Sequence, residues 1–568
     1  MNAPSPALVA ARPERLRLVG QRRQILAVMH QRLMLGMLVY GGIIALIVAR
    51  ILYLVAFGEH AGRKVGLTNL VPERGDIVDR DGQPLARTID AWTIALHPSK
   101  IIGSKLEIAR ALARLMPERD EAQYFAMLKS DKPFFYLRRR ASPAIVEAVN
   151  ALGEPGLALQ REPDRLYPQT SLAAHVIGYT DVDGHGVAGM EAAFDKHLSD
   201  PALRDQPLTL SISSRIQQAL EHELLAAMQE FSAVGAAGII MDIHSSEVLA
   251  MTSLPQLNPN AAGRGTEEAR RNRVTASVYE LGSTYKPFTV AMALDAGKVK
   301  SMGQMYSCPQ ALNVGKHTIN DTHPFGRSCS VAEIMKESSN IGTALIASQV
   351  GREAQQQFLK KMGFLDRLQI EIPERARTLY PRTDDWGEIA TMTVGFGHGI
   401  AVTPLHLATG YASLFNGGIF RPATLLKTDR SHPVPQGRRV FSEDTSYKMR
   451  SLLRLVVTEG TGRKADAPGY RVGGKTGSAE KYHNRSLLVT SFAGVFPMDE
   501  PRYVIVVMLD EPKATAKTYG FRTAGWNVAP VVSKTVSRIA PMLGVRPDKN
   551  REPNMAEVLP FVQKKAEH

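Results

Sequence analysis

The sequence contains little cysteine and lacks the signatures of several large protein classes. Cys308 and Cys329 are the only cysteines among 568 residues, so they cannot form a structural zinc site on their own. His317 and His323 lie near enough in the sequence to join them, but no zinc-finger spacing, Walker loop or aromatic RNA-binding motif occurs. A net charge of +14 favours an acidic partner such as a membrane surface, nucleic acid or an anionic polymer, and only this charge supports a nucleic acid. We therefore expect no metal, no cofactor and no nucleic-acid partner.

The composition is that of a folded protein with more than one domain. Hydrophobic residues make up 44% of the chain and charged residues 22%, which is typical of globular proteins. A chain of 568 residues is long enough for two or three domains. The cysteines have two interpretations: a disulfide that closes a short loop, if their domain lies outside the cytoplasm, or two unpaired thiols.

Long hydrophobic runs are absent except near the N-terminus. Residues 33–49 carry no charge, and after Arg50 the apolar run continues to Phe57. This length predicts a transmembrane helix over residues 33–57, with Arg50 able to reach towards an interface. A cleaved signal peptide is the alternative, but its apolar core would be shorter and would end at small residues.

Charge predicts the orientation of this helix. The preceding segment has only one acid, Glu14, against a series of arginines: Arg12, Arg15, Arg17, Arg22, Arg23 and Arg32. By the positive-inside rule, residues 1–32 form a cytoplasmic basic tail and the body lies on the other side of the membrane. No later stretch approaches 18 uncharged apolar residues, so we expect a single-pass protein.

The body divides into two regions of different character. Residues 58–205 predict an irregular domain of short strands, beginning with a hairpin whose turn is Asp81-Gly82. Residues 206–545 predict longer elements, including an amphipathic helix over 214–231. Strands are expected near 236–254 and 485–512, with VIVVML central in a sheet and helices between the two strand pairs. This arrangement predicts an α/β or α+β sandwich. Residues 546–568 are predicted to be a polar tail.

The segment LGSTYKPF, residues 281–288, predicts a nucleophile and its base. Pro287 fits only near the start of the helix that follows, which places Ser283 at a helix N-terminus. Lys286 lies one turn on, where its amine can return to the face of the Ser283 hydroxyl. A lysine with a lowered pKa is able to activate a serine for acyl transfer.

Two further motifs raise this pair above chance. A Ser-x-x-Lys pair arises by chance roughly once or twice in a chain of this length. Here Ser338-Ser339-Asn340 follows it, and then Lys475-Thr476-Gly477-Ser478, which precedes a strand pair. A given Lys-Thr-Gly triplet has odds of about one in ten in such a chain, and the order of the motifs lowers the odds further. The three together predict one active site.

These motifs, in this order, resemble the signature of penicillin-binding proteins and class A β-lactamases. The resemblance to class B penicillin-binding proteins extends from the anchor to about residue 545, through RGDIVDRDGQPLA, RLYP, AHVIGYTDVDGHGVAGMEAAFD, EVLAMTSLPQLNPN, VGFGHGIAVTPLHLA and FAGVFP. Ser-Ser-Asn and GFGHGIAVTP look more like the division-specific (FtsI-type) branch than the elongation branch. The resemblance implies an α+β protein in which a membrane anchor and a pedestal, or dimerisation-like, domain precede a penicillin-binding transpeptidase domain with an antiparallel sheet sandwiched by helices.

The resemblance also implies a function for each motif residue. The protein would be a D,D-transpeptidase that cross-links peptidoglycan stem peptides, with Ser283 attacking the penultimate D-Ala carbonyl. Lys286 would take the proton, and Ser338 and Lys475 would relay it to the leaving amine. Four further residues would bind the substrate, with the backbone N–H groups of Ser283 and Ser478 as the oxyanion hole: Asn340, Thr476, Gly477 and Ser478.

Partners and location follow from the same resemblance. β-Lactams would act as inhibitors, and a membrane glycan polymerase (FtsW-like) with other division proteins would be partners. The N-terminus would be cytoplasmic and the catalytic domain periplasmic, anchored in a bacterial inner membrane. The chain departs from the family at Leu281, where members often have proline, and at Asn258, where they often have aspartate. Neither change removes a catalytic atom.

Other activities remain as alternatives. A β-lactamase shares the motifs but would be shorter and would lack residues 58–205, and a D,D-carboxypeptidase would use water as acceptor. An elongation-type transpeptidase differs only in its role in the cell. A non-catalytic division scaffold would not need Ser283, Lys286 and Ser338 all intact.

Overall fold

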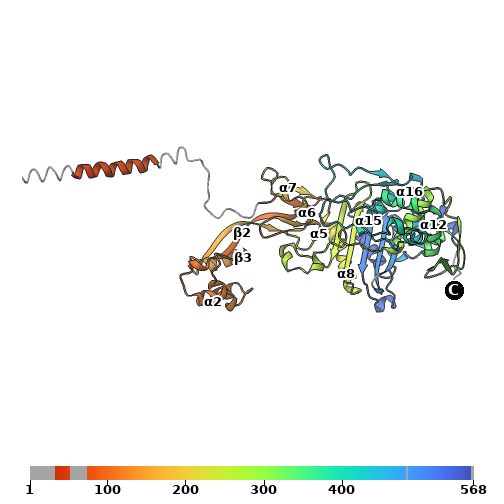
Figure 1. The fold of residues 1–568 in the computed structure, drawn as a ribbon, viewed down its shortest axis with the longest axis horizontal. Coiled ribbons are helices and arrows are strands. Elements are labelled where there is room, and N and C mark those ends of the chain that lie inside the picture. The colour runs from red at the N-terminus through yellow and green to blue at the C-terminus, as the bar shows by residue number, and fades with distance from the viewer. Residues whose placement is uncertain (1–31, 51–72, 482–483, 564–568) are drawn as a thin grey trace, which may run out of the picture. The chain divides into compact units, whose positions relative to one another are not determined.

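A computed structural model describes residues 32–50, 73–481 and 484–563 of the chain. The helix Arg32–Arg50, drawn in red in Figure 1, is long and apolar enough to cross a membrane, with a mean hydropathy of 2.1. It belongs to the first of two compact units, Met1–Leu70, and the second unit is Val71–His568. The predicted basic tail and residues 51–57 of the predicted span lie outside the described residues, as does the segment up to residue 72.

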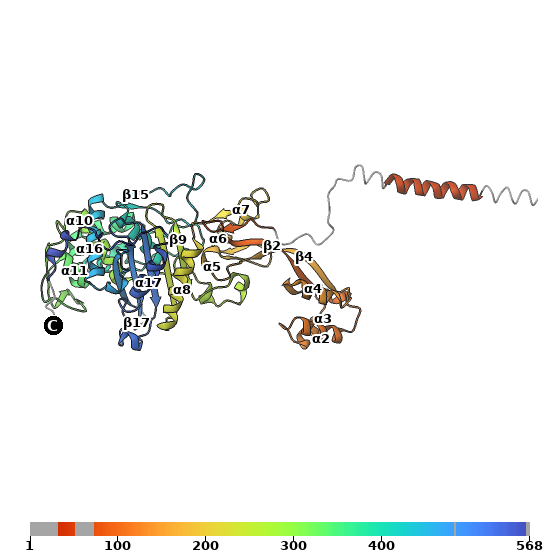
Figure 2. The same ribbon diagram turned by 180° about the vertical axis from the view of Figure 1, so that it is seen from behind.

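The second unit begins with a domain built on long antiparallel strands. β2 (Pro84–Leu96) pairs with both β3 (Phe135–Ala141) and β4 (Leu157–Leu166). Three helices pack on this sheet around a small apolar core, and Figure 2 shows them beside β4: α2 (Lys105–Leu115), α3 (Glu121–Leu128) and α4 (Pro143–Asn150). The sequence did not predict these helices, because their apolar faces are short and are buried by contacts with strands distant in sequence.

The base of this pedestal domain is held by buried ion pairs. The Glu191 carboxylate is fully buried and accepts from Arg74 Nε at 3.0 Å and from Arg165 Nε at 2.7 Å, and Arg74 Nη2 pairs with it at 2.9 Å. Tyr167 donates its hydroxyl to the same carboxylate at 3.3 Å, and Asp195 pairs with Arg74 Nη1 at 2.6 Å. These residues come from three of the sequence blocks that carry the family resemblance, so the blocks meet in one network.

The pedestal joins the larger domain through shared strands and a shared core. β1 (Ile77–Val78) pairs antiparallel with β2 and parallel with β7 (Leu208–Thr209). Asp79 accepts from the backbone N–H of Ser214, the first residue of α8 (Ser214–Glu230), at 3.1 Å. One apolar cluster contains Ile77 and Leu85 of the pedestal together with residues of the larger domain.

The larger domain contains a five-stranded antiparallel sheet in the order β16-β17-β18-β8-β9. Its strands are β8 (Gly235–Asp242), β9 (Val248–Leu254), β16 (Gly473–Lys481), β17 (Asn484–Phe496) and β18 (Tyr503–Asp510). The predicted strand VIVVML lies in β18, the third of the five, and all eight residues of β18 are buried. The sequence prediction of a central strand is therefore confirmed.

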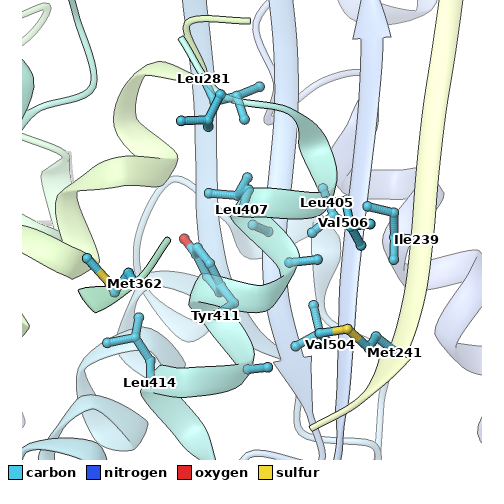
Figure 3. Packing of buried hydrophobic residues seen from close by; sticks show 14 of the residues in the cluster. Ile239, Met241, Leu281, Met362, Leu405, Leu407, Tyr411, Leu414, Val504 and Val506 are labelled. Atoms are coloured by element: carbon cyan, nitrogen blue, oxygen red, sulfur yellow. The ribbon is translucent and has the colours of Figure 1, made fainter. Parts of the chain in front are cut away.

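Helices cover both faces of this sheet because its apolar residues alternate between them. Val504 and Val506 point into one cluster, with Ile239 and Met241, while Ile505 and Val507 belong to the other. Figure 3 shows the first face, where Leu405 of α15 (Pro404–Phe415) lies beside Val506 and Ile239, while Tyr411 points to the other side of the helix. The helices α8 and α17 (Val528–Ile539) cover the opposite face. This is the predicted α+β sandwich.

A second group of helices carries residues of the first two motifs. It comprises α10 (Lys286–Asp295), α11 (Val331–Glu337), α12 (Asn340–Val350), α13 (Arg352–Lys361), α14 (Glu388–Gly395) and α16 (Glu443–Thr458). The predicted polar tail lies against this group as far as residue 563. Glu552 pairs with Arg454 of α16 at 2.7 Å, and Ser330 donates its hydroxyl to the Phe561 carbonyl at 2.6 Å.

Candidate active site

Ser283 lies in a tight turn immediately before a buried helix. Residues Gly282–Tyr285 form a 3-10 turn, and α10 begins at Lys286 with Pro287 in its first turn. The sequence predicted this placement from the proline. Tyr411 of α15 donates its hydroxyl to the Thr284 carbonyl at 2.9 Å, which fixes the turn to that helix. Ser283 is itself half-buried, so a ligand can approach it.

Lys286 points from this turn towards the second motif. It is fully buried, and its Nζ donates to Asn340 Oδ1 at 2.8 Å, to Ser338 Oγ at 3.2 Å and to the Ser338 carbonyl. No hydrogen bond in the described part of the chain joins Lys286 Nζ to the Ser283 hydroxyl. Such contacts are often long in unliganded enzymes and tighten when substrate binds.

The second motif connects two helices through a strained residue. Ser338 is the C-cap of α11, with φ 64° and ψ 43°, a left-handed conformation that is unfavourable for a serine. Ser339 is the N-cap of α12 and accepts from Gly342 N at 2.9 Å. This geometry directs Ser338 and Asn340 to the same amine.

Asp321 supports this connection, and sequence reasoning missed it. Its carboxylate accepts from the Ser339 hydroxyl at 2.6 Å, from the backbone N–H of Ile341 at 3.1 Å and from that of Asn340. The backbone carbonyl of its neighbour Asn320 accepts from Asn340 Nδ2 at 2.9 Å. No motif marks Asp321, and its only signal is its place between the two cysteines.

The segment that carries Asp321 is closed by a disulfide. Cys308 and Cys329, left open by the sequence, are bonded and lie in two paired strands, β10 (Met305–Cys308) and β13 (Arg327–Ser330). Between them is the hairpin of β11 (Ala311–Val314) and β12 (His317–Asn320), which leads directly into Asp321. The covalent link therefore restrains a segment that contacts the second motif.

The third motif lies on β16, the edge strand of the sheet. Lys475 is fully buried and donates to the Thr476 carbonyl at 3.0 Å. The Thr476 and Thr461 hydroxyls are 2.8 Å apart, and Ser478 Oγ accepts from Ala524 N at 3.0 Å. An edge strand leaves half of its backbone donors and acceptors unpaired, so β16 can bind an extended peptide.

Gly477 brings this strand against the nucleophile turn. A Cβ at this position would lie 2.4 Å from the Leu281 carbonyl oxygen and 2.9 Å from the Thr284 side chain. Gly397 allows an equally close approach on the other side, since a Cβ there would lie 2.1 Å from the Gly282 carbonyl oxygen. Glycine at both positions therefore lets three chain segments meet around Ser283.

Burial lowers the pKa of both lysines of the site. Desolvation, reinforced by the nearby positive charge of Lys475, lowers the pKa of Lys286 well below its ordinary value, and Asp321 opposes this shift. Desolvation also lowers the pKa of Lys475 to about 7. A lysine that is neutral near physiological pH is able to accept a proton.

The chain matches two family models. Residues 236–532 match the penicillin binding protein transpeptidase domain, and residues 69–200 match the penicillin-binding protein dimerisation domain. The first match lies within the larger domain, and the second covers the pedestal from residue 73, its first described residue, to residue 200.

Individual relatives agree with these matches. The probable peptidoglycan D,D-transpeptidase FtsI of Caulobacter vibrioides is 39% identical, over 83% of this chain and 82% of the relative. The FtsI peptidoglycan D,D-transpeptidase of Escherichia coli K12 is 31% identical, over 86% of each chain. Penicillin binding protein 3 of Mycobacterium tuberculosis, in a crystal structure with ampicillin, is 25% identical with a TM-score of 0.67, over 85% of this chain and 98% of that one. The chain therefore belongs to the penicillin-binding proteins, as a peptidoglycan D,D-transpeptidase of the FtsI type.

Proposed function

We propose that Ser283 is the nucleophile of this transpeptidase and that Lys286 is its base. The observation that carries the proposal is the environment of Lys286, which is fully buried and hydrogen-bonded to Ser338 and Asn340. None of the ion pairs among the described residues involves Lys286, so no carboxylate fixes its charge. Its lowered pKa leaves a neutral amine available to a serine three residues away.

The reaction would proceed in two acyl transfers. The Ser283 oxygen attacks the carbonyl carbon of the penultimate D-Ala of a stem peptide, and its proton passes to Lys286 Nζ. The peptide C–N bond then breaks, and the terminal D-Ala leaves as an amine after receiving a proton relayed through Ser338 and Lys475. An amine of a neighbouring strand attacks the resulting ester and regenerates Ser283.

The third motif would bind the substrate during both steps. Thr476 and Ser478 are suited to hold the terminal carboxylate, with positive potential from Lys475 when it is protonated. Asn340 would hold the substrate amide, and Gly477 would keep the bound peptide close to Ser283, because it lets β16 approach the nucleophile turn. The backbone N–H groups of Ser283 and Ser478 would stabilise the oxyanion, a contribution of about 3 to 4 kcal/mol per donor in other acyl transferases.

The cellular setting belongs to the same proposal. The helix Arg32–Arg50 is the single membrane span, with the basic N-terminal tail in the cytoplasm and the catalytic domain in the periplasm. Septal synthesis is the role, and a membrane glycan polymerase of the FtsW-like type, together with other division proteins, supplies the strands. Support comes from the FtsI-type relatives and from the lack of any glycosyltransferase motif in the sequence.

A test of the reaction separates transfer from hydrolysis. Full-length protein in detergent is incubated with a stem pentapeptide donor and an amine acceptor, and mass spectrometry follows D-Ala release and the cross-linked product. We expect a cross-linked product from the wild type and none from Ser283→Ala. Release of D-Ala without any cross-linked product would indicate a carboxypeptidase, and activity in Ser283→Ala would remove the nucleophile assignment.

A further inference from the structure

A cavity of about 660 Å³ is lined by residues that are close in sequence to the motif residues. Its walls include Glu280, Tyr380 and Gly399 on one side and Glu480 and Lys481 of β16 on the other. We call it the β16 cavity. Glu280 comes three residues before Ser283, and Glu480 comes two residues after Ser478, so both walls extend from the proposed catalytic machinery.

The β16 cavity is directly continuous with the nucleophile turn. A Cβ on Gly282 would lie 3.4 Å from both the Ala479 Cβ and the Ser478 carbonyl oxygen, so the turn touches β16 just before the cavity begins. Side chains two apart on a strand point to the same face. Ser478 and Glu480 therefore share a face, and both are exposed.

Acidic side chains outnumber basic ones among the described residues that line the cavity, since Glu280 and Glu480 face one lysine, Lys481. Lys481 Nζ is engaged by Asp510 and by Glu511, each at 2.6 Å. Glu280 accepts from Gly399 N at 3.0 Å and lies 2.8 Å from His398 Nδ1. Glu480 has no hydrogen bond or ion pair to another described residue. A cavity carboxylate that has no partner in the described part of the chain is notable in a protein whose net charge is +14.

Apolar groups complete the lining and limit the shape of a ligand. Tyr279, Leu379 and Val489 line the cavity together with the ring of Tyr380. Leu379 and Tyr380 are exposed, although a folded protein gains by burying such side chains. An aliphatic chain would cover these groups while a cationic end reaches the carboxylates.

We propose that the β16 cavity binds a primary ammonium group, carried on an aliphatic side chain of a peptidoglycan stem peptide, and that Glu480 selects it. The inference rests on the proposed transpeptidase function, because it places a second recognition element beside the acyl group on Ser283. The ammonium has two possible sources in that reaction: the side chain of the donor peptide itself, or the amine of the acceptor strand before it loses a proton and attacks.

The experiment compares wild-type full-length protein with Glu480→Gln, which removes the charge and keeps the shape. Glu353→Gln is the matched control, because that side chain is 83% exposed on α13 and outside the cavity. The donor arm uses two depsipeptide donors that differ only in whether the aliphatic side-chain amine is free or acetylated. The acceptor arm uses the acetylated donor with a tripeptide whose side-chain amine is free.

Each arm has a ratio as its readout. If the donor supplies the ammonium, Glu480→Gln lowers the preference for the free-amine donor by roughly fivefold, in line with a charge-assisted contact. If the acceptor supplies it, the ratio of transfer to hydrolysis falls by roughly fivefold and the donor preference is unchanged. Both ratios unchanged relative to wild type and Glu353→Gln would overturn the proposal.

The rate of penicillin acylation shows whether the cavity assignment alone is wrong or the proposed transpeptidase function is wrong as well. Benzylpenicillin carries no ammonium group, so Glu480→Gln is expected to acylate within twofold of the wild-type rate. A wild-type protein that does not acylate at all would overturn the proposed function and the cavity assignment together. Normal acylation with unchanged ratios would overturn the cavity assignment alone.

Discussion

The pedestal and the active site both bury basic side chains, but only those of the pedestal are paired with a carboxylate among the described residues. In the pedestal, Arg74 and Arg165 converge on the Glu191 carboxylate at 2.9 and 2.7 Å. In the active site, Lys286 and Lys475 are fully buried, and no ion pair to either occurs among the described residues. Burying a charge is unfavourable unless it is paired, so the pedestal stabilises its cations as ions and the active site favours neutral amines.

This difference separates a structural role from a chemical one. Arginine stays protonated and binds carboxylates in a fixed geometry, which suits a network that joins distant parts of the pedestal. Lysine changes its pKa readily when buried, which suits a residue that must accept and donate protons. The pKa of Lys475, lowered to about 7 by burial, is the clearest sign of the second case.

The largest expected effect comes from removing the amine of Lys286. Lys286→Met keeps the length of the side chain and removes the base, so we expect the rate of penicillin acylation to fall by about 10³- to 10⁴-fold. Stopped-flow or gel-based labelling measures it. The variant is expected to remain folded, because the buried amine has no ion pair among the described residues and an apolar group of similar length replaces it.

Lys336→Met is the matched control for this change. Lys336 is also buried but lies 3.7 Å from Glu337 and 3.8 Å from Glu459, so its charge is paired. We expect acylation within about threefold of the wild-type rate, since no base is lost. Equal losses in the two variants would mean that acylation depends on packing in this region and not on the Lys286 amine.

The second effect concerns the pedestal. Glu191→Gln leaves two buried guanidinium groups without their shared carboxylate, and we expect a loss of about 3 to 5 kcal/mol in the free energy of unfolding. Denaturant unfolding measures it, and acylation under native conditions should persist. Glu121→Gln, at an exposed pair with Arg110 whose side chains are 39% and 53% exposed, should cost less than about 1 kcal/mol. Similar losses at both sites would contradict a stabilising role for burial of the network.

The third effect comes from the disulfide. Replacing Cys308 and Cys329 by serine opens a loop with a sequence separation of 21 residues, and we expect a loss of about 3 kcal/mol from the entropy of the unfolded chain. The loss should appear in the unfolding of the transpeptidase domain, and reduction of the wild type by dithiothreitol should reproduce it. If the variant and the reduced protein match the oxidised wild type in stability, the bond does not restrain this segment.

The smallest effect is a shift in pH dependence. Asp321 raises the pKa of Lys286, so Asp321→Asn should lower that pKa. Acylation requires neutral Lys286, and its acid limb should therefore move to lower pH. The maximal rate should also fall by roughly tenfold, because the carboxylate no longer holds the connection between α11 and α12. A loss of rate with an unmoved acid limb would show that Asp321 does not act on the charge of Lys286.

Much of the fold was predictable where one pattern dominates a long segment. The apolar run of β18 and the four-residue repeat of α8 indicated a central strand and a helix, and both are present. The pedestal helices α2 to α4 were not predicted, because their burial depends on contacts with β2 and β4 that are distant in sequence. Their short apolar faces alone do not distinguish helix from loop.

Residues of the candidate site were likewise predictable only where a local sequence pattern marks them. Pro287 indicated the turn at Ser283, because proline restricts where a helix can begin. Asp321 was missed because its function depends on a backbone conformation, the capped connection around Ser339, that no local pattern encodes. The β16 cavity was missed for a related reason: Glu280 and Glu480 are 200 residues apart and meet only in the folded chain.

The most direct test of the account locates the acyl group. Full-length protein is labelled with benzylpenicillin and digested, and tandem mass spectrometry identifies the modified residue in the wild type and in Ser283→Ala. We predict one acylated peptide, modified at Ser283, in the wild type and no acylation in the variant. Acylation at another residue, or equal labelling of Ser283→Ala, would contradict the assignment of Ser283 and Lys286 as nucleophile and base.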